Sequence, residues 1–261
     1  MIVKKTDSFK KLLAFGCSIT FGEELNESTV IQSDFFKNST RAKSLYKIKT
    51  LDFNDIANTL KVEDHKFWHE MLKLDYDNFK KECHFKSYPG VLSSLLNVTD
   101  YRNYSIPGAS NISILSELVR NSANIDSDTL VIIGVTFPLR KTKLLNDPYC
   151  LYSFPTLFYF PAIPAVERLI AATSDDDSIE QDLHVLHLIK SILDNAGCSY
   201  LIFNAVGFKE SLFDDINQIL FIPNVIPLND DSYAKSRCFL GHPGSDVHIT
   251  TAQLLYKELM R

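Results

Sequence analysis

The stretch "LLAFGCSITFGEEL", residues 12–25, runs from an apolar segment into a glycine, a cysteine and a serine. Residues 12–16 predict a buried strand, because a short apolar run that ends at glycine is typical of a strand entering a turn. Ser18 then lies just beyond the end of this strand. The stretch leaves two roles open for Ser18: an ordinary turn residue, or a nucleophile held where the strand breaks.

Similar apolar runs return along the chain, with helical patterns between them. Alternating strands and helices are typical of a parallel sheet that is covered by helices on both faces. The run "TLVIIGVT" at 129–136 is apolar throughout, as expected for a strand that is buried on both faces. We therefore predict a three-layer α/β/α, flavodoxin-like domain with a parallel sheet of about five strands. The other predicted strands are 100–106, 199–207 and, more weakly, 224–228.

Three helices are predicted from capping residues and periodicity. Asn111 is expected to cap the first, and Ser178 begins a second that stops at Gly197. The last helix is expected to carry Ile249 and Ala252 on its apolar face.

One segment interrupts the alternation of strands and helices. Residues 26–86 are polar, dotted with aromatic residues and largely helical in pattern from 53 to 82. We interpret the chain 1–261 as a single α/β domain, with 26–86 as a helical insertion over the carboxyl end of the first strand. An insertion at this place could act as a lid.

Composition indicates which kinds of binding partner and which cellular compartment to expect. The chain has 27 basic and 32 acidic residues, a net charge of −5 and no basic block, which disfavours nucleic acid as a partner. Its five cysteines are scattered, which disfavours a disulfide framework and favours a reducing compartment. No run of about 18 apolar residues and no signal-peptide pattern is found, so we expect no membrane partner and a cytoplasmic or virion-associated protein.

Patterns for metals and cofactors are weak. His65 and His69 have i, i+4 spacing and His184 and His187 have i, i+3 spacing, but neither pair has a third ligand nearby. No glycine-rich nucleotide motif occurs. The sequence therefore predicts no metal and no cofactor.

Four residues are expected to meet at one edge of the sheet. Ser18 and Gly108 follow the first two predicted strands, Thr136 ends the third, and His242 lies in the loop before the last helix. Ligands of open parallel sheets bind beyond the carboxyl ends of the strands. The order and placement of these four residues indicate a site there.

These residues stand in motifs that resemble those of a known family. "GCSIT" at 16–20, "NYSIPGASN" at 103–111 and "GHP" at 241–243 are similar to the conserved blocks of the SGNH (GDSL-type) hydrolases, most of all to divergent phage and bacterial members. The resemblance covers nearly the whole chain apart from the insertion. It implies that Ser18 is the nucleophile, that Gly108 contributes to the oxyanion hole and that His242 is the general base.

The oxyanion block departs from the family pattern. Its asparagine is replaced in "IGVTF" by Thr136, whose hydroxyl reaches less far than an amide. The hole would then rest on the backbone N–H groups of Ser18 and Gly108, with Thr136 or Asn111 as a side-chain donor.

The acidic residue of the triad is also missing, since Phe239 stands three residues before His242. Asp230, Asp231 or Asp246 could orient the imidazole in its place. A backbone carbonyl could also orient the ring, or Ser18 and His242 could act together as a dyad.

Two neighbouring residues offer competing assignments. We prefer His242 over His248 as the base, because a proline follows His242 and because His248 begins the last helix, where a structural role is expected. Cys17 alternates away from Ser18, so we predict a buried, apolar role for it.

Together these observations predict a serine ester hydrolase that acts on a small-molecule or carbohydrate ester, such as a carbohydrate O-acetyl ester. The aromatic-rich segment 149–160 either packs under the insertion or offers a sugar-stacking or protein-binding wall. A competing hypothesis is a catalytically degenerate structural or binding protein, for example a subunit of a phage particle. Self-association as a homo-oligomer or in a larger assembly is left open.

Overall fold

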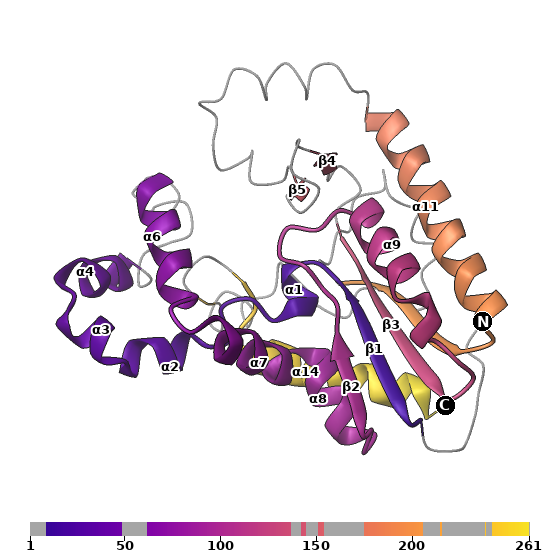
Figure 1. Cartoon of the computed structure of the whole chain (residues 1–261), viewed down its shortest axis with the longest axis horizontal. Coiled ribbons are helices and arrows are strands. Elements are labelled where there is room, and N and C mark those ends of the chain that lie inside the picture. Colours follow the sequence, from indigo (N-terminus) through magenta and orange to yellow (C-terminus); the bar gives the residue numbers. More distant parts are fainter. Residues whose placement is uncertain are drawn as a thin grey trace.

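A parallel sheet forms the centre of the computed structural model, which describes residues 9–48, 62–136, 142–144, 151–153, 175–205, 215, 238 and 242–260. The four strands of this sheet have the order β2–β1–β3–β6 and are all parallel (Figure 1). This confirms the predicted α/β class, and the predicted strand 224–228 lies outside the described residues. The strands are β1 (Lys11–Gly16), β2 (Asp100–Asn103), β3 (Thr129–Val135) and β6 (Ser199–Asn204).

Strand β3 lies between β1 and β6, and all of its residues are buried. This burial explains why its sequence is apolar without alternation. Its register with β1 pairs Gly16 with Gly134, so the two strands end side by side at their carboxyl ends.

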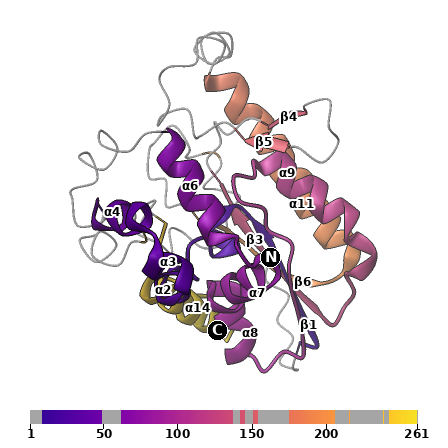
Figure 2. The ribbon, with the colours of Figure 1, turned by 60° about the vertical axis from the view of Figure 1, so that its left-hand side comes forward.

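Helices cover both faces of the sheet (Figures 1 and 2). One layer contains α9 (Asn111–Arg120) and α11 (Asp175–Ala196), which pack on each other. The opposite layer contains α8 (Tyr88–Leu95) and α14 (Ser245–Leu259). The chain passes through α8 between β1 and β2 but through α9 between β2 and β3. The two connections therefore diverge between β1 and β3, where open α/β sheets form a ligand crevice.

Helix boundaries differ in detail from the predicted ones, and Ser178 lies inside α11 rather than at its start. Ser110 rather than Asn111 is the N-cap of α9, since its Oγ accepts a hydrogen bond from the Ser113 N–H at 3.2 Å. Gly197 follows the end of α11 with a φ of +64°. Ile249 is exposed because the buried face of α14 is rotated from the predicted one. That face is formed by His248, Thr251, Ala252 and Leu255.

The inserted segment is helical from its start, well before residue 53. Its helices lie to the left of the sheet in Figure 1 and enclose an apolar cluster around Trp68, Met71 and Phe79. Phe21, from the short helix α1 (Ser18–Phe21), joins this cluster and connects the insertion to the end of β1. A role as a lid stays a prediction. The helices are α2 (Glu27–Gln32), α3 (Asp34–Asn38), α4 (Thr40–Ile48), α6 (Val62–Leu72) and α7 (Tyr76–Lys86).

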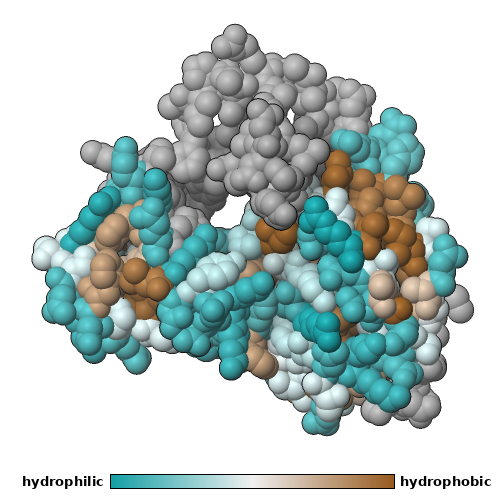
Figure 3. Space-filling model, viewed as in Figure 1, coloured by the Kyte–Doolittle hydropathy of each residue, from teal (hydrophilic) through white to brown (hydrophobic). Residues whose placement is uncertain are grey.

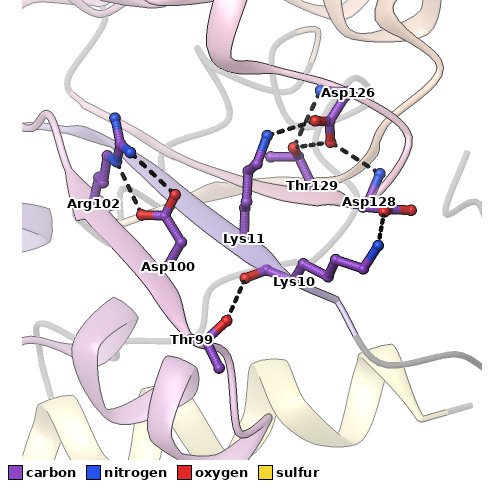
Figure 4. A network of polar contacts seen from close by, with 8 residues as sticks. All are labelled: Lys10, Lys11, Thr99, Asp100, Arg102, Asp126, Asp128 and Thr129. Carbon is purple, nitrogen blue, oxygen red and sulfur yellow. Dashed lines mark hydrogen bonds and ion pairs between the residues drawn. The ribbon is translucent and has the colours of Figure 1, made fainter.

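Exposed ion pairs lie at the amino ends of the strands (Figure 4). Lys10 Nζ is 2.7 Å from Asp128 Oδ2, and Lys11 Nζ is 2.5 Å from Asp126 Oδ2. Thr129 Oγ1 donates to Asp126 Oδ1 at 2.8 Å. The remaining elements are the 3₁₀ helix η1 (Ser122–Asn124) and an antiparallel pair that the sequence did not indicate, β4 (Thr142–Leu144) with β5 (Leu151–Ser153).

Candidate active site

Two glycines allow helix α1 to pack closely against the carboxyl ends of β1 and β3. A Cβ on Gly16 would lie 2.0 Å from Thr20 Oγ1, and one on Gly134 would lie 2.2 Å from the same atom. Thr20 is fixed from two further sides: its Oγ1 accepts from the Tyr88 hydroxyl at 2.8 Å, and its carbonyl accepts from Asn103 Nδ2 at 2.9 Å. Only glycine leaves room for this approach, which holds the helix at the carboxyl ends of β1 and β3.

Ser18 is the first residue of α1 and lies at the end of β1. Its carbonyl accepts hydrogen bonds from the N–H groups of Gly22 and Glu23, both at 3.0 Å. Gly22 ends the helix with a φ of +81° and turns the chain sharply. Among the described residues, none makes a hydrogen bond with the Ser18 hydroxyl, and the residue is 5 % exposed.

Two carboxylates from this turn bracket the imidazole of His242. Glu24 Oε2 lies 2.9 Å from Nδ1 and accepts the His242 backbone N–H at 3.3 Å, while Glu23 Oε2 lies 3.4 Å from Nε2. The other oxygen of Glu24 accepts from Trp68 Nε1 at 3.2 Å. Glu24 is fully buried and Glu23 is 6 % exposed. The segment that carries Ser18 thus also supplies the acidic partners of the histidine.

The backbone of Glu24 is strained. Its φ of +69° lies in the left-handed region, which costs a residue with a Cβ about 1–2 kcal/mol. Such a conformation persists only where surrounding contacts fix it, and it is concentrated at functional sites. The contacts of Glu24 with Trp68 and His242 supply this fixation.

The charges around His242 set its protonation. Burial acts to lower the pKa of the imidazole, but the charge of Glu23 and the hydrogen bond and charge of Glu24 outweigh it and raise the pKa to about 9. The thiol of Cys17, next to Ser18, acts in the same direction. His242 is therefore an imidazolium at neutral pH, held between two carboxylates at the strand ends.

His248, six residues further on, is in the opposite situation. It is completely buried, its ring stacks on Tyr88 with centroids 6.0 Å apart, and its Nδ1 accepts the Tyr88 backbone N–H at 3.0 Å. Burial, with repulsion from His242, lowers its pKa to about 3. His248 is thus a neutral packing residue between α14 and α8.

The carboxylate at His242 is one that sequence reasoning missed. Asp246 is exposed in α14, and Asp230 and Asp231 lie outside the described residues. The only signal for Glu24 was the "GEEL" ending of the opening stretch, where two acidic residues follow a turn glycine. A contact between residues 218 positions apart leaves no periodic pattern in the sequence.

Gly108 lies close to the same strand end. The Ala109 N–H donates to the Ile106 carbonyl at 3.0 Å, and Gly108 has a φ of +79°, as expected at the third position of a type II turn. The Ile106 N–H donates to the Gly16 carbonyl at 3.1 Å, which ties this turn to the end of β1. The structure therefore brings the Gly108 turn beside the segment of Ser18.

The side chain of Asn111 forms two hydrogen bonds with the backbone of Thr136. Asn111 Oδ1 accepts the Thr136 backbone N–H at 3.0 Å, and its Nδ2 donates to the Thr136 carbonyl at 3.2 Å. The Asn111 amide thus braces the end of β3. The buried Thr136 hydroxyl has no hydrogen-bond partner within the described part of the chain.

The remaining residues that the sequence singled out have no described catalytic contact. Cys17 is fully buried in the main core, and its thiol is free. His184 and His187 are exposed on α11, and the side chains of His65 and His69 are outside the description. Over the described ranges, no three metal-ligating side chains form a cluster. None of the helices described has the length and apolar composition that a bilayer crossing requires.

No model of a known protein family matches the sequence, and no curated protein is recognisably similar to it. Among solved structures, the chain is similar to a carbohydrate esterase whose active site is described as displaying divergent catalytic and non-catalytic binding functions. The sequences are 10 % identical, the TM-score is 0.48, and the alignment covers 98 % of this chain and 69 % of the esterase. This is a distant relation in fold and carries no inference about activity.

Proposed function

We propose that this chain is an SGNH-type serine ester hydrolase, with Ser18 as nucleophile, His242 as general base and Glu24 as the carboxylate that orients the base. The contact that carries the proposal is the one between Glu24 Oε2 and His242 Nδ1, at 2.9 Å. It supplies the acidic partner that the sequence motif lacks. A carboxylate at Nδ1 keeps the proton on that nitrogen and leaves Nε2 to act as the base.

The reaction follows from these roles. Nε2 of neutral His242 takes the hydroxyl proton while Ser18 Oγ attacks the ester carbonyl carbon, which gives a tetrahedral oxyanion. The oxyanion collapses, the alcohol leaves with the proton from Nε2, and an acyl-serine forms. Water, deprotonated by Nε2, then attacks the acyl-serine, and its collapse releases the acid and returns the proton to Ser18.

Backbone N–H groups are the proposed donors to the oxyanion. Ser18 lies at the start of α1 and Gly108 in a turn tied to the end of β1, so both belong to the same strand end. Thr136 has a buried hydroxyl without a described partner and is a better side-chain donor than Asn111, whose amide is engaged with the backbone. A well-placed donor of this kind contributes about 3–4 kcal/mol to transition-state stabilisation.

The resting arrangement requires one change before reaction. Nε2 lies against Glu23, and the raised pKa keeps a proton on the ring at neutral pH. Loss of this proton weakens the attraction to Glu23 and frees Nε2 for Ser18. Catalytic hydrogen bonds are commonly loose before the substrate binds.

The substrate class is proposed from the family resemblance. SGNH-type motifs together with an aromatic-rich segment favour a carbohydrate O-acetyl ester. The helical insertion, which joins the core through Phe21 next to the Ser18 turn, is proposed to shape access to the site.

Hydrolysis of p-nitrophenyl acetate at pH 9, with subtraction of the spontaneous rate, tests the activity. We expect turnover by the wild type, its loss in Ser18→Ala and wild-type rates in Ser94→Ala, which removes an exposed serine of α8. A fluorophosphonate probe should label Ser18, which peptide mass spectrometry would locate. Equal rates for Ser18→Ala and wild type, with no label on Ser18, would contradict the proposal.

A second candidate function is supported by the contacts of the imidazolium. Both ring nitrogens of His242 face carboxylates, and no described residue makes a hydrogen bond with the Ser18 hydroxyl. This arrangement suits a structural or binding protein that keeps the fold without the chemistry. A wild-type protein that neither turns over the ester nor reacts with the probe up to pH 10 would favour this candidate.

A further inference from the structure

An open hollow of about 350 Å³ lies between α7 and β2. Its rim includes Lys80, Lys81 and Asp77 from the helix and Arg102 from the strand. Among the described strands, β2 is at the edge of the sheet, so the hollow lies at that edge. The surface over α7 and β2 is largely hydrophilic (Figure 3).

The rim carries a net positive charge. In the described part of the chain, Lys80 and Lys81 form no ion pair. Arg102 is paired with Asp100, with Nε–Oδ1 at 2.9 Å and Nη2–Oδ2 at 3.1 Å (Figure 4). Asp77 is the acidic residue of the lining. Two lysines against one aspartate leave an excess of positive charge that faces the hollow.

An exposed aromatic ring lies beside these cations. Phe85 is 57 % exposed although it is a large apolar residue. Its ring contacts that of Tyr101, a half-buried residue of β2, at an angle of 61° with the centroids 6.2 Å apart, which limits how the Phe85 ring can turn. A fixed apolar face next to free ammonium groups matches a ligand that has both a ring and a negative charge.

We propose that this hollow binds a small organic anion, with a ring packed on Phe85 and a carboxylate or phosphate group paired with Lys80 and Lys81. Charge-assisted hydrogen bonds to a carboxylate or phosphate are stronger than neutral ones. Asp77 opposes the same anion and limits the affinity.

The inner wall of the hollow is shared with the segment of Ser18. His84 lines it and packs edge-on against Phe21 of α1, with centroids 4.7 Å apart. Asn103 also lines it and donates to the Thr20 carbonyl at 2.9 Å. The anion site is nevertheless separate from Ser18 and does not depend on ester hydrolysis.

Titration of the ¹⁵N-labelled full chain by NMR tests this site. Glucuronate, with a sugar ring, and benzoate, with an aromatic ring, are the probes, and glucose and inorganic phosphate each lack one of the two features. We expect saturable shifts of the amides of Lys80, Lys81, Phe85 and Arg102 with at least one ring-bearing anion, and weaker binding of phosphate. The better of the two ring probes identifies the kind of ring. Glucose should cause no shifts.

The Kd of anion binding by variants tests which residues contact the anion. Lys80→Ala/Lys81→Ala should raise the Kd about tenfold, as expected when two charge-assisted contacts are lost. Asp77→Asn should lower the Kd several-fold, and Lys66→Ala/Lys73→Ala, which removes two exposed lysines at α6 and just after it, should leave it unchanged. Ser18→Ala should bind as the wild type does. Equal shifts with glucose, phosphate binding as tight as that of the ring probes, or an unchanged Kd in the Lys80/Lys81 variant would each overturn the proposal.

Discussion

The two ends of the sheet carry the same kind of interaction in opposite surroundings. At the amino ends, Lys10 with Asp128 and Lys11 with Asp126 form exposed pairs (Figure 4). At the carboxyl ends, His242 lies between Glu23 and Glu24, which are almost completely buried.

Burial decides what the charges do at each end. Water and salt screen the amino-end pairs, so their geometry contributes little to folding. At the carboxyl end, two carboxylates meet an imidazole in a poorly hydrated place, so they control its proton. The exposed pairs at the amino ends therefore have little effect on the protein, whereas the buried carboxylates at the carboxyl ends determine whether His242 is protonated.

The largest loss of ester hydrolysis is expected for Glu24→Gln. The glutamine oxygen can still accept from Trp68, but its amide would donate to Nδ1 and leave the proton of neutral His242 on Nε2. We expect turnover of p-nitrophenyl acetate to fall about 10⁴-fold, as when the acid of a Ser-His-Asp triad is replaced by its amide. Asp246→Asn, at the exposed aspartate of α14, is the control and should be silent. A loss in Asp246→Asn alone would assign the orienting role to Asp246 instead.

The second-largest effect is expected on the hydrolysis rate and the stability as the pH is changed. Because the folded pKa of His242 is about 9, the neutral imidazole and the rate should increase about tenfold per pH unit from 7 to near 9. Stability should move the other way. The unfolded histidine has a pKa of about 6.5, so the stabilisation from the folded imidazolium is complete below 6.5 and is lost as the pH rises through 9. Rate profiles and urea unfolding at pH 6, 7.5 and 9 measure both trends. A rate that is flat above pH 7 would show that His242 titrates with an ordinary pKa.

A smaller effect is expected for Glu23→Gln. This change removes the charge that attracts the Nε2 proton but keeps Glu24 at Nδ1, so the pKa of His242 should fall. The rate at pH 7 should increase several-fold, while the rate at pH 9.5 should stay within about twofold, since the base is then largely neutral in both proteins. The shift of the rate profile, or the imidazole signals in NMR, gives the pKa. A lower rate at both pH values would instead make Glu23 a part of the catalytic machinery.

The smallest effect is expected at the amino end. Lys11→Met keeps the apolar stem of the side chain and removes its pair with Asp126, in which the two side chains are 31 % and 52 % exposed. We expect a loss of less than about 1 kcal/mol in urea unfolding, and no difference from wild type in 1 M salt. A loss that persists in 1 M salt would show that the amino end is better insulated from water than its exposure indicates.

The sequence was a good guide to the sheet and to the positions beyond it. Strand β3 was recognisable because seven buried residues in a row leave an apolar run that no helix surface produces. The sequence also predicted that Ser18 and Gly108 lie at the same edge of the sheet, since residues that follow parallel strands are found at one edge. Boundaries were less certain, as at α9, where Ser110 and Asn111 are both good caps and only the backbone geometry selects Ser110.

What the sequence determined by itself was local: an apolar run forms a strand, a turn glycine follows it, and a serine comes next. The tertiary structure decided which carboxylate contacts His242 and whether its imidazole is protonated. Glu24 reads in the sequence as one polar residue among many. It becomes the partner of His242 because Gly22 turns the chain, Trp68 from the insertion donates to one of its oxygens and His242, just before α14, contacts the other. The same folding separates His242, with a pKa of about 9, from His248, with one of about 3, because protonation depends on neighbours in space rather than along the chain.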